Sequence, residues 1–76
     1  MNRPKVPSDP ALYSPFRLSN SCIGITWRAA DGWYGCLRFD GKPDCNFVGP
    51  LKSVIDTRLL IRAEFVGASI SELIAD

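Results

Sequence analysis

Two stretches of alternating apolar and polar residues flank a turn sequence near the middle of the chain, and they restrict this region to a β-hairpin. In residues 23–28 isoleucine and tryptophan alternate with small or polar residues, and residues 33–39 are rich in aromatic and aliphatic side chains. This pattern is typical of half-buried strands. The intervening Ala30-Asp31-Gly32 contains residue types favoured in hairpin loops. A further apolar run at residues 45–48 follows a second turn-rich segment and predicts a third strand.

The length of the first loop sets the hairpin register. A two-residue loop, Asp31-Gly32, places Ile25 opposite Arg38, whereas a three-residue loop that begins one residue earlier places Ile25 opposite Leu37. A one-residue slip exchanges the two faces, so burial of one wholly apolar face favours the longer loop. The second face, which we expect to be exposed, then carries Thr26, Arg28, Tyr34, Cys36, Arg38, Asn46 and Val48.

The carboxy-terminal part of the chain has helical periodicity. Residues 50–66 read as a helix, with Pro50 suited to its first position and Gly67 to its end. An alternative makes residues 59–66 a fourth strand. The predicted core-facing stripe is Leu51, Val54, Ile55, Leu59, Ala63 and Val66, and the neighbouring Leu60, Ile61 and Phe65 widen it enough for the helix to be covered on more than one side.

A second, short helix is predicted after Gly67. Ser69 followed by Glu72 is a capping-box pattern for residues 70–75.

The first sixteen residues are expected to form an extended arm. They contain four of the six prolines, which disfavour a helix or a central strand. Leu12, Tyr13 and Phe16 at its end are too apolar to be left together in water. They either cover an edge of the core or dock on a partner.

Together these segments predict an α+β fold. A three-stranded antiparallel meander packs on one or two carboxy-terminal helices, and a proline-rich arm precedes it. We expect residues 1–16 to be the arm and residues 17–76 to be a single domain. A chain of 76 residues buries only about 60% of its unfolded surface, so its stability is marginal.

The composition argues against several functional classes. The three cysteines, Cys22, Cys36 and Cys45, are an odd number without paired spacing, and we interpret them as free thiols. The chain has no histidine and no ligand set for zinc, so we expect no metal, no cofactor and no enzymatic activity. The net charge is +1, with no basic run for nucleic acid or membrane binding. No signal-like or membrane-spanning segment is present, which makes the cytoplasm the expected location.

The predicted binding residues lie on the polar face of the meander. Arginine and tyrosine are enriched in interface hot spots because they combine apolar area with directed hydrogen bonds. The candidate site therefore comprises Arg28, Tyr34, Arg38 and Asn46, with Trp33 at the end of the sheet as a further candidate. In the favoured register Arg28 lies across from Tyr34.

The run from Trp33-Tyr34 to Phe39, a turn, Phe47-Val48, and then residues 51–56 resembles small phage and mobile-element accessory proteins, including anti-CRISPR inhibitors. The resemblance implies a non-enzymatic inhibitor or adaptor in the host cytoplasm that occupies a surface of a host protein or complex. Edge strands and a small core also allow a homodimer.

The alternative function is sequence-specific DNA binding. A three-stranded sheet backed by a helix resembles the domain of plant ethylene-response factors and the amino-terminal domain of some phage integrases. In that case Arg28, Tyr34, Arg38 and Asn46 would read bases from the exposed sheet face. The small net charge argues against this mode of binding.

Overall fold

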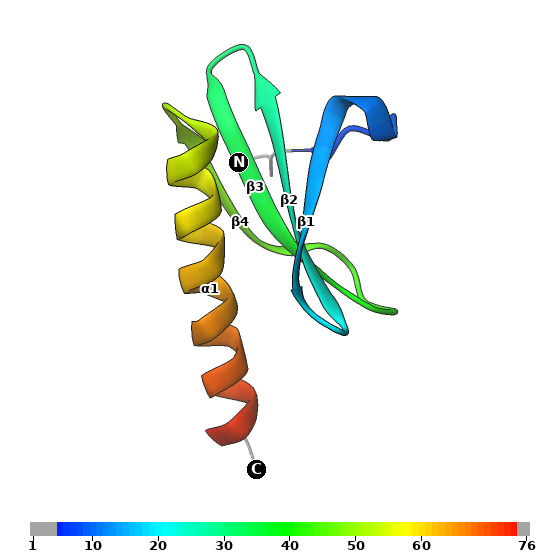
Figure 1. Cartoon of the computed structure of the whole chain (residues 1–76), viewed down its shortest axis with the longest axis vertical. Coiled ribbons are helices and arrows are strands. Elements are labelled where there is room, and N and C mark those ends of the chain that lie inside the picture. The colour runs from blue at the N-terminus through cyan, green and yellow to red at the C-terminus, as the bar shows by residue number, and fades with distance from the viewer. Residues whose placement is uncertain (1–4, 75–76) are drawn as a thin grey trace.

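A computed structural model describes the backbone of residues 5–74 and the side chains of residues 5–70. A short 3-10 turn, Pro10–Leu12, precedes four strands and one long helix (Figure 1). The elements are β1 (Tyr13–Ser19), β2 (Cys22–Ala29), β3 (Gly32–Phe39), β4 (Cys45–Leu51) and α1 (Val54–Ile74). The predicted α+β class is therefore confirmed, with one sheet and a carboxy-terminal helix.

The sheet has four antiparallel strands in the order β1-β2-β3-β4, so the prediction of three strands is wrong. The additional strand comes from the end of the predicted arm, where Tyr13 pairs with Trp27 and Phe16 pairs with Gly24. Pro15 is accommodated because β1 is an edge strand, where a missing amide donor is tolerated. The arm before β1 is mostly exposed, and residues 1–4 lie outside the described part of the chain.

The hairpin between β2 and β3 has a register that differs from the predicted one. Ile25 lies opposite Cys36 and Trp27 opposite Tyr34, so the loop contains only Ala30 and Asp31. The prediction assumed that one sheet face is buried and the other exposed. In the structure both faces carry buried side chains. The burial of a single apolar face is therefore not the criterion that sets the register. Between β3 and β4, Leu37 lies opposite Cys45.

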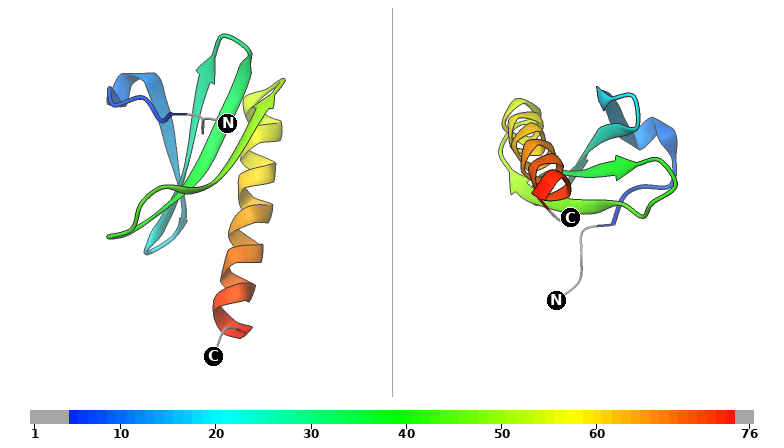
Figure 2. Two further views of the ribbon diagram at one scale, coloured as in Figure 1. Left: turned by 180° about the vertical axis from the view of Figure 1, so that it is seen from behind. Right: turned by 90° about the horizontal axis from the view of Figure 1, so that it is seen from below.

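The helix lies against one face of the sheet (Figure 2). Gly24 and Gly35 face it. A Cβ atom at Gly35 would overlap the Ile61 side chain, and a Cβ at Gly24 would overlap the Phe16 ring and approach Ile61 Cγ2 to 3.0 Å. Ile61 is fully buried and packs with Cys22 and other residues of this core. The absence of side chains at the two glycines thus makes room for Ile61.

The side of α1 that faces the sheet is not the predicted one. Of the predicted core stripe, Ile55, Leu59 and Val66 are 68%, 61% and 54% exposed, and Ala63 is exposed as well. The buried side instead carries Thr57 and Ile61, with further contacts from Phe65 and Ala68. Both sides of the helix are apolar, so periodicity alone could not decide between them.

The helix boundaries also differ from those predicted. Pro50 belongs to β4, and α1 begins at Val54. Ser53 stabilises this start, since its Oγ accepts the Asp56 amide at 3.1 Å and its carbonyl oxygen accepts the Thr57 hydroxyl at 2.7 Å. Helical structure continues through Gly67 to Ile74, so neither the predicted second helix nor the alternative strand over residues 59–66 is formed. Ala75, the end of that predicted helix, lies outside the described residues.

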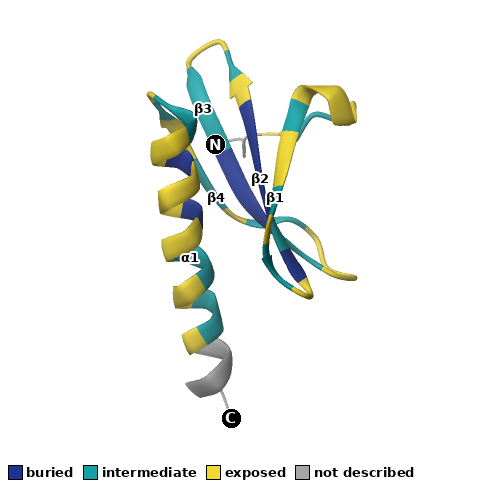
Figure 3. Ribbon diagram, viewed as in Figure 1, coloured by how far each residue is buried: buried dark blue, intermediate teal, exposed yellow. Residues whose placement is uncertain are grey.

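A second cluster occupies the sheet face away from α1. Ile25, Trp27 and Cys36 are buried there. The Trp27 ring stacks on Tyr34 with centroids 5.9 Å apart and meets Phe47 edge-on at 6.5 Å. This cluster is also contacted by Val6, so the segment before β1 contributes to its cover. The meander is therefore buried on both faces near its centre (Figure 3).

Candidate protein-binding site

The five predicted site residues do not share one face of the sheet. Tyr34 and Arg38 lie on the face away from α1, opposite Trp27 and Ile23 respectively. Arg28 lies opposite Trp33, and these two residues alternate onto the other face. The prediction that Arg28, Tyr34 and Arg38 point together into solvent is therefore wrong, because the actual register differs by one residue.

Arg38 of β3 is engaged in contacts within the molecule. Its Nε and Nη2 donate to the two carboxylate oxygens of Asp44 at 2.7 and 2.9 Å. Its guanidinium carbon also lies 5.8 Å from the centroid of the Tyr13 ring. The hydrogen bonds to Asp44 raise the pKa of Arg38 above its ordinary value, so the side chain remains charged. This geometry ties the turn before β4 to the sheet.

Tyr34 and Asn46 likewise make contacts within the molecule. Tyr34 Oη donates to Asp31 Oδ2 at 2.7 Å, and this hydrogen bond is the main cause of the raised pKa of Tyr34. Asn46 adopts a positive φ of 54°. Its Nδ2 donates to Glu64 Oε1 of α1 at 3.0 Å. Asn46 therefore joins β4 to the helix.

Arg28 and Trp33 are the two predicted residues that the structure brings together. They are cross-strand neighbours near the β2–β3 turn, at the end of the molecule where α1 begins (Figure 1). Trp33 also pairs with Leu51 of β4. A shallow hollow forms there, which we call the Trp33 hollow; it is lined by Arg28, Ala29, Ala30, Asp31, Gly32, Trp33, Pro50, Leu51 and Lys52.

The Trp33 hollow combines an apolar floor with positive charge. Trp33 and Leu51 are half-buried, whereas Arg28, Pro50 and Lys52 are exposed. Two cations and one carboxylate line it, and that carboxylate accepts the Tyr34 hydroxyl. The nearby first turn of α1 adds the positive end of a helix dipole. Such a surface suits an acidic segment that also carries an apolar side chain.

Sequence reasoning identified Arg28 and Trp33 by residue type but missed Pro50, Leu51 and Lys52. These residues were assigned to the helix, because Pro50 is a favoured first helical residue. These three residues could have been found only by extending the predicted third strand from residue 48 to Leu51, because that extension brings β4 alongside Trp33.

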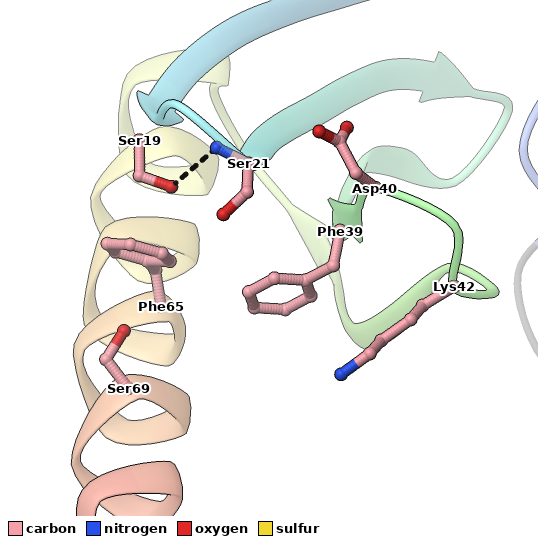
Figure 4. A pocket seen from close by; sticks show the side chains of 7 residues that line it. All are labelled: Ser19, Ser21, Phe39, Asp40, Lys42, Phe65 and Ser69. Carbon is pink, nitrogen blue, oxygen red and sulfur yellow. Dashed lines mark hydrogen bonds between the residues drawn. The ribbon is translucent and has the colours of Figure 1, made fainter.

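A second hollow lies at the other end of the sheet, between the β1–β2 turn, the end of β3 and α1 (Figure 4). Phe39 and Phe65 stack there with centroids 6.4 Å apart. Its polar lining consists of Ser19, Ser21, Asp40, Lys42 and Ser69. The Ser21 amide donates to Ser19 Oγ at 3.3 Å, so the Ser19 hydroxyl is held by the backbone of the β1–β2 turn. We interpret this second hollow as a polar rim over the aromatic end of the core.

The cysteines are placed in the packed interior. Cys22 and Cys36 are buried, Cys45 is half-buried, and all three are free thiols. Burial raises the pKa of each thiol, and that of Cys36 reaches about 12. Thiols with raised pKa values are poor nucleophiles at neutral pH. Among residues 5–70, no group of three or more acidic, cysteine or histidine side chains is arranged to hold a metal ion.

Comparisons with known protein families, curated proteins and solved structures find no match to this chain. Within residues 5–74, α1 lacks the combination of length and apolar character that crossing a membrane requires.

Proposed function

We propose that the chain is a small non-enzymatic protein-binding module that contacts its partner through the Trp33 hollow. In this proposal it acts as an inhibitor or adaptor, in the manner of phage and mobile-element accessory proteins, and occupies an acidic surface of a host protein or complex. The observation that carries the proposal is the direct cross-strand pairing of Arg28 with Trp33 beside Lys52. Tryptophan and arginine are the residue types most enriched in binding hot spots.

The division of the polar residues between two faces favours protein over DNA as the partner. Reading bases from the exposed sheet face needs Arg28, Tyr34, Arg38 and Asn46 on one surface. Arg38 is paired with Asp44, and Asn46 is turned toward Glu64 of the helix. The Trp33 hollow, in contrast, gathers two cations and a tryptophan within one small area.

Selection from a random peptide library on the immobilised protein tests the proposal. We expect enriched peptides that combine acidic residues with a large apolar residue. Their binding should perturb the fluorescence of half-buried Trp33 more than that of Trp27, which is 4% exposed. Arg28→Glu and Lys52→Glu should each weaken binding about threefold to tenfold, because each removes a favourable charge and adds an unfavourable one.

Arg17→Glu provides the matched control, since Arg17 is an exposed arginine on β1, distant from the hollow in the sheet order. It should leave peptide binding unchanged. Equal binding by the wild type and Arg28→Glu would contradict the proposal. Tight binding of duplex DNA that weakens steeply with salt and is lost in Arg28→Glu would instead support the DNA-binding alternative.

A further inference from the structure

The side of α1 turned away from the sheet carries a continuous apolar stripe. We define the outer stripe as Ile55, Leu59, Ala63, Val66 and Ile70. Its four large members are between 50% and 68% exposed. At about 100° per residue these five side chains lie within roughly 80° of each other, directly opposite Ile61. Figure 3 shows exposed residues along the helix up to its grey last turn.

Charged side chains border this stripe but lie outside it. The cations nearest to it, Arg58 and Arg62, are drawn toward β1, where their guanidinium carbons lie 5.4 and 5.7 Å from the centroid of the Phe16 ring. On the other flank the exposed Asp56 lies about 20° beyond Ala63, and beyond it Leu60, which is 39% exposed, adds further apolar surface. An apolar helix face with its nearest cations held aside is suited to pack against another apolar surface.

The order of residues in the stripe makes it complementary to itself. If a two-fold axis passes beside Ala63 and relates two antiparallel copies of α1, Ile55 of one copy meets Ile70 of the other. Leu59 then meets Val66, and the two Ala63 residues meet at the axis. Small residues at the crossing point let helices approach closely, while the larger pairs fill the space on either side. The stripe spans about 22 Å, at 1.5 Å per residue.

The available area is sufficient for a reversible dimer. A fully exposed aliphatic side chain offers roughly 120 Å² of apolar surface, so the four large stripe residues and Leu60 supply about 330 Å² per chain. Homodimer interfaces are about 65% apolar, which implies about 1,000 Å² buried over both chains. This equals the approximately 1,000 Å² expected of the smallest specific interfaces. Interfaces at this lower limit are typical of weak, reversible association.

We propose that the outer stripe of α1 binds the same stripe of a second copy in antiparallel orientation, forming a two-fold symmetric dimer with the sheets on its outside. The dimer is independent of the Trp33 hollow, because that hollow is lined by the β2–β3 turn and residues 50–52 and not by the stripe. Each dimer therefore presents two hollows.

Site-directed cross-linking tests the orientation. Disulfide formation is followed in full-length Ala63→Cys, Ile55→Cys and Ile70→Cys variants, with the wild type reporting any reaction of the native cysteines. In the antiparallel dimer Ala63→Cys should cross-link with itself. Ile55→Cys and Ile70→Cys should each fail alone but cross-link when mixed. Self-cross-linking of Ile55→Cys, or its failure to react with Ile70→Cys, would overturn the proposed arrangement.

Sedimentation equilibrium tests the association itself, over protein concentrations from about 1 to about 500 μM. The wild type should shift from the monomer mass of 8.4 kDa toward twice that value. Leu59→Asp should weaken the dimer at least about tenfold, because an aspartate would be buried without a partner in both copies. Leu12→Asp is the matched control, since Leu12 is 63% exposed, close to the 61% of Leu59, but lies outside the stripe. It should change dimerisation less than about twofold.

Circular dichroism confirms that both variants remain folded, and Val66→Asp replaces Leu59→Asp if the latter does not. A wild-type chain that stays monomeric over this range overturns the proposal, even if α1 binds another protein. Equal weakening by Leu12→Asp and Leu59→Asp also overturns it. A folded Leu59→Asp monomer that still binds the selected peptides would separate the dimer from the proposed function.

Discussion

Adding a methyl group at Gly35 probes how the helix is seated on the sheet. A Cβ atom there would overlap Ile61 Cδ1 and lie 3.0 Å from the carbonyl oxygen of Ile25. Ile61 is fully buried, and its Cγ2 atom lies close to Gly24, so its side chain has little room to move away. Gly35→Ala should therefore lower the free energy of unfolding, because the added methyl group overpacks the core.

The magnitude follows from two opposing contributions. Overpacking of a core by one methyl group costs about 1–3 kcal/mol. Replacing a glycine within a strand recovers about 0.5–1 kcal/mol through reduced backbone entropy in the unfolded state. We expect a net loss of about 1 kcal/mol for Gly35→Ala, since the overpacking cost exceeds the entropic gain. Ile61→Val removes the Cδ1 atom and should cost about 1 kcal/mol by itself.

The double variant distinguishes this specific contact from a general effect. Without Cδ1 the overlap is removed, although the Cγ1 atom of residue 61 and the Ile25 carbonyl oxygen remain 3.0 Å from the new methyl group. Gly35→Ala/Ile61→Val should therefore be about 1 kcal/mol more stable than the two separate losses predict. Urea unfolding followed by the fluorescence of buried Trp27 measures each free energy of unfolding. A coupling energy within about 0.5 kcal/mol of zero would refute the proposed seat for Ile61.

Gly24→Ala supplies a control on the same face of the sheet. A Cβ atom there would overlap mainly the Phe16 ring, and valine retains the Cγ2 atom of Ile61 that approaches Gly24. Gly24→Ala should therefore be destabilising but should show much weaker coupling to Ile61→Val. This seat also fixes the rotation of α1, since the outer stripe faces solvent only while Ile61 faces the glycines.

Two further predictions concern the buried thiol and the helix interior. Burial raises the pKa of Cys36 from 9.0 to about 12, so the folded state favours the neutral thiol. The stabilisation that results from keeping the thiol neutral is fully present below about pH 9 and is lost as the pH rises toward 12, because the unfolded chain ionises first. Between about pH 9 and pH 11 the free energy of unfolding of the wild type, measured by urea unfolding, should therefore fall by about 2–3 kcal/mol more than that of Cys36→Ala. A Cys36→Ala profile as steep as that of the wild type would contradict this. Gly67 lies inside α1, and an added Cβ would meet no atom within 4 Å. Gly67→Ala should therefore stabilise the protein by about 0.5–1 kcal/mol in thermal unfolding, and any destabilisation would count against the continuous helix.

Local patterns in the sequence were sufficient to place most of the elements. Alternation identified β2, β3 and the beginning of β4, and helical periodicity identified α1. These elements were predictable because their signals depend on neighbouring residues. β1 was missed because its prolines suggested an arm, although an edge strand accepts proline.

The sequence by itself therefore determined that the chain forms an antiparallel sheet with a carboxy-terminal helix, and it marked Arg28 and Trp33 as candidate contact residues. Only the tertiary structure decided the register and the rotation of α1. Both sheet faces and both sides of the helix are apolar, so no local pattern distinguishes the buried alternative. The choice depends on the fit of Ile61 against Gly24 and Gly35, residues distant in sequence. The fit of Ile61 turns the outer stripe of α1 toward solvent. The observed register of β2 and β3 places Arg28 beside Trp33.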